Sequence, residues 1–175
     1  HSMLALAGLL TACGEAPVVE GSEFETKAHS TVAVAGMAGP AGEIHGETRL
    51  QKSKGQLLLS VELSALPAGL SGFHLHTYGN CEGPDFKSAG GHLNPEGKQH
   101  GQDNPQGSHL GDLPNLEIAP DGTASSTVPL VGDADVLLDA LFDADGTAVM
   151  IHAEPDDYET DPTGNAGARI SCGVL

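Results

Sequence analysis

Alternation of apolar and polar positions is the strongest pattern along this chain. Short segments in which every second residue is apolar recur from residue 31 onward, and such a pattern is typical of a strand with one face turned inward. Paired turn residues at Lys54-Gly55 and Asp121-Gly122 separate neighbouring segments and indicate hairpins. Residues 134–141 are either one short helix or a packed loop. The strands are expected at 31–37, 42–50, 57–63, 72–76, 115–118, 124–128, 148–152 and 168–172.

Two long stretches, 77–113 and 153–167, carry no apolar period. Long loops inside a compact domain are usually functional or disordered, and the histidines of the first stretch favour function. About eight short strands with two long excursions predict an all-β fold, an antiparallel β-sandwich or flattened barrel.

Composition is consistent with one turn-rich domain. The 175 residues are 39% apolar, they include 24 glycines, 11 prolines and no tryptophan, and no segment reaches the ~20 apolar residues of a membrane span. A formal net charge of −17 argues against nucleic acid or an anionic membrane surface as a partner. At long range it also repels an anionic substrate.

The N-terminal segment resembles a bacterial lipoprotein export signal. His1-Ser2 is interpreted as a tag remnant, and the apolar run 3–10 leads through small residues to Cys13, the candidate for lipidation. The alternative is a surface helix or strand with an incidental cysteine. On this hypothesis the chain divides into a signal-like segment at 1–12, a polar tether at 13–26 and a folded domain at 27–175.

The other two cysteines form an even pair if Cys13 carries lipid. Disulfides persist in exported proteins, so Cys81 and Cys172 are candidates for a bridge between positions 91 residues apart. The alternative is two free buried thiols.

Histidine carries the clearest chemical signal. Five of the nine histidines lie between positions 74 and 109, and His74 and His76 project from the same face of an expected strand. Neutral imidazole is the commonest nitrogen ligand of metals, so the cluster predicts a metal site, although any single histidine could be a solvated loop residue. The remaining candidate ligands are His92, His100, His109, Asp112 and His152.

Counting these ligands predicts two adjacent metal sites. Six histidines and one aspartate supply seven ligands where two four-coordinate sites need eight. Either one site keeps an open position, or one imidazole binds a metal through each ring nitrogen. Three histidines with an aspartate suit structural zinc, whereas four nitrogens in a near-square arrangement suit copper(II).

The sequence resembles the copper/zinc superoxide dismutases over roughly residues 30–175. The resemblance rests on spaced motifs at 72–76 (GFHLH), 90–95 (GGHLNP), 109–113 (HLGDL), 149–152 (VMIH) and 164–174 (GNAGARISCGV). It implies a Greek-key antiparallel β-sandwich with two long functional loops. It also implies a copper redox cycle that dismutates superoxide to oxygen and hydrogen peroxide beside a structural zinc.

The resemblance implies a role for each matching residue. His92 would be shared by both metals and take up a proton when copper is reduced, Arg169 would guide superoxide, and Thr163 would narrow the channel. Without the resemblance, Arg169 would be interpreted as a surface ion-pair residue and Asp156 as a solvated acid. His29 and His45 match no ligand position and are interpreted as ordinary strand histidines. The implied copper ligands are His74, His76, His92 and His152; the zinc ligands are His92, His100, His109 and Asp112; Asp156 links a copper histidine to a zinc histidine, and Cys81 and Cys172 form the disulfide.

We therefore expect an exported enzyme in the periplasm or cell envelope, anchored by lipid on Cys13, with superoxide as substrate, copper and zinc as cofactors, and two copies pairing as a homodimer. The alternatives are an exported copper- and zinc-binding protein without catalysis and an adhesive sandwich domain. Residues 153–168 contain five acids and no lysine, which leaves Lys87 and Lys98 as candidates for steering. We expect a slower and less salt-dependent enzyme than a well-steered one.

Overall fold

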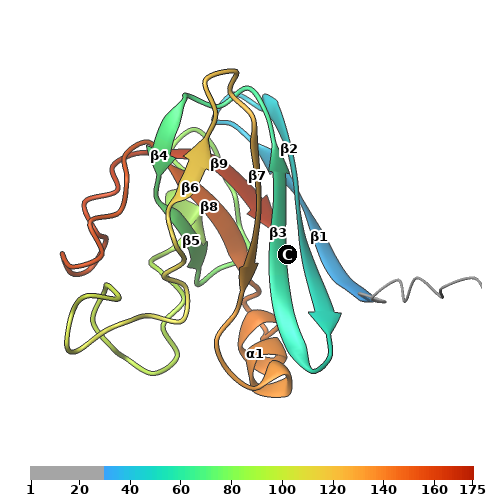
Figure 1. The fold of residues 1–175 in the computed structure, drawn as a ribbon, viewed down its shortest axis with the longest axis vertical. Coiled ribbons are helices and arrows are strands. Elements are labelled where there is room, and N and C mark those ends of the chain that lie inside the picture. Colours follow the sequence, from blue (N-terminus) through green and yellow to red (C-terminus); the bar gives the residue numbers. More distant parts are fainter. Residues whose placement is uncertain (1–29) are drawn as a thin grey trace, which may run out of the picture.

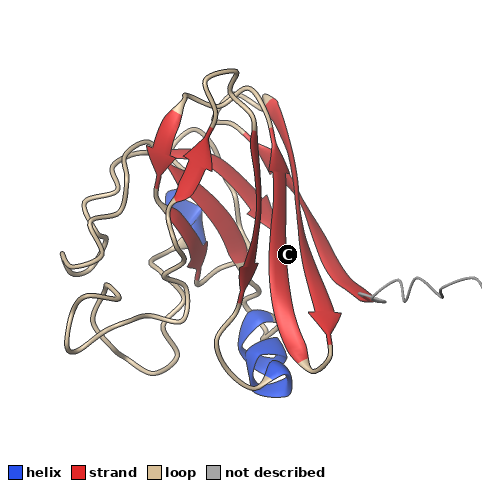
Figure 2. Cartoon of the chain, viewed as in Figure 1, coloured by secondary structure: helices blue, strands red, loops and turns tan. Residues whose placement is uncertain are grey.

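The computed structural model describes residues 30–175, and in this part of the chain nine strands form two antiparallel sheets (Figures 1 and 2). The large sheet curls on itself and has the order β5-β8-β9-β1-β2-β3-β7, while β4 and β6 pair separately. The strands are β1 (Ser30–Ala38), β2 (Ile44–Ser53), β3 (Gln56–Leu63), β4 (Gly69–Ser71), β5 (Phe73–His76), β6 (Leu116–Ile118), β7 (Ala124–Pro129), β8 (Ala148–His152) and β9 (Arg169–Val174).

The connections are those of a Greek key. Strands β1, β2 and β3 follow one another along the chain and in space, and β9 returns from the far end of the sequence to lie beside β1. The long return of the last strand to a place beside the first is a connection of the Greek-key type, with β4 to β8 inserted between β3 and β9. The expected all-β antiparallel fold class is confirmed.

The two predicted turns both form, but only one closes a hairpin. Lys54 and Gly55 have φ values of 49° and 80° between β2 and β3, as a type I′ hairpin turn requires. Gly122, with φ of 81°, turns the chain between β6 and β7. However, β6 pairs with β4, whose three residues Gly-Leu-Ser show no apolar alternation in the sequence.

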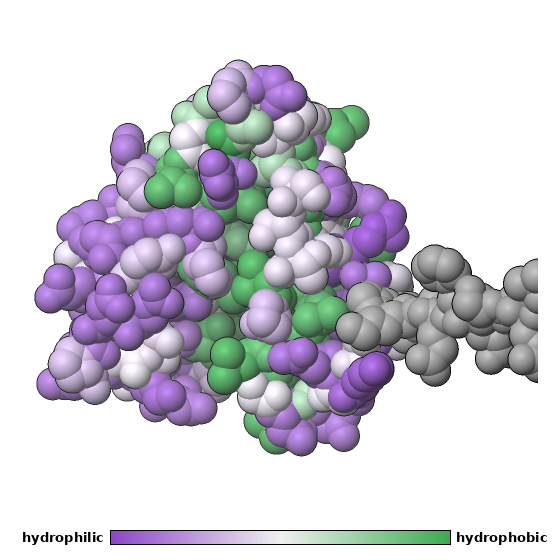
Figure 3. Space-filling model, viewed as in Figure 1, coloured by the Kyte–Doolittle hydropathy of each residue, from purple (hydrophilic) through white to green (hydrophobic). Residues whose placement is uncertain are grey.

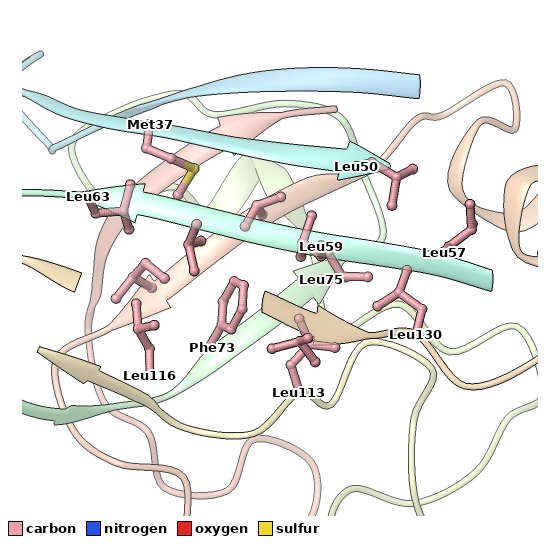
Figure 4. Close-up of a cluster of buried hydrophobic side chains, with 14 of the residues drawn as sticks. Met37, Leu50, Leu57, Leu59, Leu63, Phe73, Leu75, Leu113, Leu116 and Leu130 are labelled. Carbon is pink, nitrogen blue, oxygen red and sulfur yellow. The ribbon is translucent and has the colours of Figure 1, made fainter. Parts of the chain in front are cut away.

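The core lies inside the curl of the large sheet (Figure 4). Strand β3 contributes every second side chain to it, at Leu57, Leu59, Val61 and Leu63. On β5, Phe73 and Leu75 join this core, so the same alternation turns His74 and His76 to the other face.

The helix α1 (Ala134–Leu141) resolves the open choice for this segment. Asp133 caps it by accepting hydrogen bonds from the backbone N–H groups of Asp135 and Val136. Its buried face consists of Ala134, Leu137 and Leu141. None of the helices in residues 30–175 has the length and apolar character needed to cross a membrane.

The disulfide and the two long loops complete the fold. Cys81 and Cys172 are bonded, with Cα atoms 5.8 Å apart, which confirms the pairing and excludes two free thiols. The loops 77–115 and 153–168 lie side by side at the left of Figure 1, where Asp103 N–H donates to the Tyr158 carbonyl at 3.0 Å. In Figure 3 polar side chains cover much of the loops, while apolar side chains such as Leu113, Val128 and Leu130 contribute to the lining of a hollow between the loop 77–115 and the end of β7.

Candidate metal centre

The first long loop lies along the free edge of β5 and replaces a neighbouring strand there. Leu75 N–H donates to the Gly111 carbonyl at 2.9 Å, and Leu93 N–H donates to the Leu75 carbonyl at 2.8 Å. The approach needs glycine at position 111, because a Cβ atom there would lie 2.3 Å from the Leu75 carbonyl oxygen. As a result, the loop sets Asp112 opposite His74 and His92 opposite His76.

Four buried histidines converge at this edge, and we call them the all-histidine group. Two come from β5, one from the loop and one from the end of β8, and one ring nitrogen of each lies within 4.8 Å of the others. The Nε2 atoms of His76 and His152 are 3.4 Å apart. This group can hold a metal ion, and its members are His74, His76, His92 and His152.

The backbone orients the rings by binding the nitrogens that face away from the centre. His76 Nδ1 lies 3.0 Å from the Gly90 carbonyl oxygen, and His152 Nδ1 lies 3.3 Å from the Gly167 carbonyl oxygen. A carbonyl can only accept, so both Nδ1 atoms carry the proton and both Nε2 atoms present a lone pair. Both lone pairs are therefore available to a metal ion.

His74 provides the sharpest test of whether a metal fits. Its Nε2 lies 2.6 Å from Asp156 Oδ2 and therefore donates to that carboxylate. Its Nδ1 is buried and has no hydrogen-bond partner among residues 30–175. A buried polar atom without a partner is costly, and a metal ion facing this lone pair removes that cost. The four-nitrogen donor set is also the type that copper(II) prefers.

A second group shares His92 and adds His100, His109 and Asp112; we call it the mixed group. Asp112 Oδ1 lies 2.8 Å from His92 Nδ1 and 3.0 Å from each Nδ1 of His100 and His109, while the Nδ1 atoms of His92 and His100 are 3.3 Å apart. A tetrahedral zinc ion with bonds of about 2.0 Å separates its ligands by roughly 3.3 Å. The spacing of this group therefore fits zinc.

Asp156 connects the two groups. Its Oδ2 faces His74 Nε2 of the all-histidine group, and its Oδ1 lies 3.0 Å from His100 Nε2 of the mixed group. Each of these rings therefore keeps its Nδ1 atom turned toward its own group. An outer carboxylate of this kind fixes the tautomer and the orientation of a ligand ring.

Burial keeps the shared centre uncharged. It lowers the pKa of His76 to about 2, of His152 to about 3 and of His92 to about 4, and repulsion from neighbouring imidazoles adds to the effect at each ring. These three imidazoles are therefore neutral, as metal ligands must be, at any physiological pH.

His100 behaves in the opposite way. Burial alone would lower its pKa, but the carboxylates of Asp112 and Asp156 outweigh burial and raise the pKa to about 9. Burial acts to raise the pKa values of the two carboxyl groups, yet their hydrogen bonds to histidine hold both well below the usual range. In the metal-free protein, His100 is thus a cation between two anions.

One arginine lies beside the all-histidine group. The guanidinium of Arg169 donates to the carbonyl oxygens of Phe86 and Gly90, each at 2.6 Å, and its positive charge helps to lower the pKa values of His76 and His152. The bridge from Cys81 to β9 holds the segment that supplies these carbonyls. Thr163 is exposed in the neighbouring loop.

Both lysines considered for steering are ion-paired. Lys87 Nζ lies 2.6 Å from Asp85, and Lys98 Nζ lies 2.8 Å from Glu96. Neither lysine therefore adds a net positive charge of its own near the centre.

Sequence reasoning missed several residues that brace the centre. Asn115, Tyr158 and Asp161 make hydrogen bonds between the two long loops, and no spacing or motif in the sequence marks them. His45 is buried on β2, with Nδ1 2.9 Å from Ser171 Oγ, and belongs to neither group. His29 and Cys13 lie outside the described residues.

Known proteins are similar to this chain over most of its length. Residues 42–175 match the family model described as copper/zinc superoxide dismutase. A copper–zinc superoxide dismutase of Aquifex aeolicus is 44% identical over 137 residues, which cover 77% of this chain and 81% of that protein.

Two solved structures are also similar. A superoxide dismutase-like protein of Bacillus subtilis is 37% identical with a TM-score of 0.77, covering 83% of this chain and 99% of that one. A Cu/Zn superoxide dismutase of Brucella abortus is 29% identical with a TM-score of 0.65, covering 82% and 98%.

Proposed function

The chain belongs to the copper/zinc superoxide dismutase family, and we propose that its two buried ligand groups hold one metal each. Its activity is the dismutation of superoxide to oxygen and hydrogen peroxide, with copper and zinc as cofactors. The all-histidine group takes copper and the mixed group takes zinc, with His92 shared through its two ring nitrogens. The observation that carries this assignment is the buried, unpartnered Nδ1 of His74, as judged within residues 30–175.

Bound copper supplies one-electron redox chemistry at the all-histidine group, while zinc supplies charge without redox chemistry. The residues of the chain orient the ligand rings and provide a nitrogen for proton transfer. His92 Nδ1 stays beside Asp112 and His100, so its Nε2 is the nitrogen available to take up and return a proton. Asp156 keeps the His74 and His100 rings in register while this occurs.

Arg169 is proposed to receive the superoxide anion. Arginine stays charged at any working pH and offers directed donors to a small anion. Two backbone carbonyls fix its guanidinium, and the effect of its charge on His76 and His152 supports a position at the approach to the copper ligands. Thr163, exposed in the loop 153–168, is proposed to narrow the same approach.

A metal-binding protein without catalysis is not favoured. Storage of copper or zinc needs no guide for an anion, whereas this chain keeps a fixed arginine near the copper ligands and belongs to an enzyme family. An adhesive sandwich domain would leave the two ligand groups unexplained.

Zinc affinity is expected to increase with pH up to about 9. Below that pH the metal-free His100 carries a proton, and zinc must displace it from Nδ1. The dissociation constant for zinc should therefore rise by about tenfold for each unit of pH below 9. Competition with a colorimetric chelator between pH 6 and pH 9 measures this slope.

Copper uptake provides the internal control for that experiment. The control is copper binding to the zinc-free protein: the pKa values of His76, His92 and His152 lie below the tested range, and without zinc His92 keeps a proton on Nδ1 while Nε2 faces copper, so these ligands release no proton. A zinc affinity that stays constant from pH 6 to pH 9 would contradict the prediction.

The rate of superoxide decay is expected to depend weakly on salt. The loop 153–168 has five acids and no lysine, both nearby lysines are ion-paired, and the net charge is −17. We expect the rate to change by less than about threefold between roughly 0.01 M and 0.15 M salt, because long-range attraction contributes little to the encounter. Stopped-flow decay over a salt series measures this, and a steep fall would contradict it.

A charge substitution at the loop provides the positive control. Glu154→Lys adds a cation two residues after His152 and should increase both the rate and its salt dependence. Asp139→Lys makes the same change of charge on α1, at a distance from the loops, and should do neither.

We further propose that the chain is exported, anchored through lipid on Cys13, and paired with a second copy. The disulfide supports export, since such bonds persist in oxidising compartments. The exposed valines of β1 and β9, Val32, Val34 and Val174, support pairing. Mass spectrometry of the native chain tests for the lipid, and sedimentation of the purified protein tests for the pair.

A further inference from the structure

Tyr158, two residues after Asp156 in the loop 153–168, has an unusual backbone conformation. Its φ of 63° lies in the left-handed region, which a bulky residue rarely adopts. Such a conformation persists only where the surroundings fix it, and it is frequent at functional sites. Keeping Tyr158 in this conformation therefore costs the fold some free energy, which its contacts must offset.

Three hydrogen bonds fix the residue. Its backbone N–H donates to Asp156 Oδ1 at 2.6 Å, and its carbonyl accepts from Asp103 N–H at 3.0 Å. Its hydroxyl oxygen accepts from the backbone N–H of Asn115 at 2.8 Å. Tyr158 therefore bonds both the carboxylate between the metal groups and the neighbouring loop that carries the zinc ligands.

Asn115 returns the connection to Asp156. Its side-chain Nδ2 donates to the Asp156 carbonyl at 2.9 Å, and its Oδ1 accepts from the Asp156 N–H at 2.8 Å. Asp156 is held in this way through its backbone by Asn115 and through its carboxylate by Tyr158. The hydrogen bond between the Tyr158 hydroxyl and the Asn115 N–H connects the two residues that hold Asp156.

The loop 77–115 also packs closely against Tyr158. A Cβ atom at Gly101 would lie 2.1 Å from the Tyr158 carbonyl oxygen, so only glycine permits this approach. Gly101 N–H donates to Asp112 Oδ2 at 3.0 Å, which leaves Oδ1 of that carboxylate for the mixed group. Tyr158 thus contacts the outer supports of both Asp112 and Asp156.

We propose that Tyr158 is a positioning residue, whose hydroxyl and backbone set the Asp156 carboxylate so that His74 and His100 present their Nδ1 atoms to copper and zinc. The inference rests on the metal assignment proposed above. It predicts that the Tyr158 hydroxyl, which contacts none of the metal ligands, affects the affinity of the chain for both metals.

The test compares the two tyrosines of the chain. Tyr158→Phe removes only the hydroxyl and leaves the Asn115 N–H without its acceptor. Tyr78→Phe makes the same change at a half-exposed residue whose hydroxyl has no hydrogen bond within residues 30–175. Both variants and the parent are loaded with one copper and one zinc, and zinc release to a colorimetric chelator is followed at fixed pH.

We expect zinc release to be about tenfold faster in Tyr158→Phe and unchanged in Tyr78→Phe, in line with other substitutions outside the ligand shell. The copper(II) electron paramagnetic resonance spectrum should shift in the same variant, because the His74 ring loses its fixed orientation. Equal zinc release and identical spectra in the two variants would overturn the inference.

A double variant separates positioning from general stabilisation of the loop. If Tyr158 acts through the Asp156 carboxylate, Tyr158→Phe should add nothing to zinc release in a chain that already carries Asp156→Asn. The same acceleration in both backgrounds would overturn the proposed route. If the parent chain fails to bind one copper and one zinc, the metal assignment itself is wrong, which is a different result from equal behaviour of two loaded variants.

Discussion

His152→Ala is expected to reduce the rate of superoxide decay by more than about 100-fold, because substitutions of outer partners alone cost metal sites about 10- to 100-fold and this one removes a ligand. His152 closes the all-histidine group from the end of β8, with Nε2 3.4 Å from His76 Nε2. The mixed group lies on the other side of His92 and should keep its zinc. Stopped-flow decay, with the copper and zinc content of each preparation measured, gives the result.

His45→Ala is the matched control for that substitution. His45 is also a buried strand histidine, but it bonds Ser171 and belongs to neither metal group. The His45→Ala variant should keep its copper and its activity. If His152→Ala decomposed superoxide at the parent rate, the assignment of copper to the all-histidine group would be wrong. No decay in the parent despite one copper per chain would make the protein a metal buffer and leave Arg169 without a role.

Replacing both bridged cysteines, as Cys81→Ala with Cys172→Ala, is expected to lower the free energy of unfolding by about 4 to 5 kcal/mol. The bridge joins positions 91 residues apart, so its loss frees a long loop in the unfolded chain. Denaturant unfolding of the metal-free proteins measures the change. Cys13→Ser, which replaces a cysteine but leaves the bridge intact, is the control.

The same double variant should also lower activity. The bridge anchors the segment whose Phe86 and Gly90 carbonyls accept from the guanidinium of Arg169. Without the anchor, Arg169 is less firmly placed and should receive superoxide less well, even where copper content is unchanged. Unfolding at the same denaturant concentration as the parent, together with an unchanged rate, would contradict both expectations.

Most of the sheet could be predicted because its strands are long enough to show their period. In β3 every second residue enters the core, and the alternation is visible in the sequence without any knowledge of partners. Strand β4 (Gly69–Ser71) was not predicted because Gly-Leu-Ser has a single apolar residue and shows no alternation, whereas the equally short β6 reads Leu-Glu-Ile. The pairing of β6 with β4 instead of β7 depends on how the chain curls, which local patterns do not record.

The ligand candidates could be singled out from the sequence because histidine and aspartate carry their chemistry in the side chain. The groups that orient those rings could not. His76 and His152 bond backbone carbonyls at Gly90 and Gly167, which any residue possesses. Asn115 meets Asp156 across 41 positions, and only the folded loops bring the two residues together.

The loop along β5 also protects an edge strand from pairing with other molecules. The hydrogen bonds that Gly111 and Leu93 make with Leu75 satisfy backbone groups of an edge strand. While this loop is unseated, those groups are open to strands of other molecules, and an open edge is where intermolecular sheets begin. The loop that carries His92 and Asp112 thus also covers an edge strand through the neighbouring residues Leu93 and Gly111, so one segment serves both metal binding and protection from aggregation.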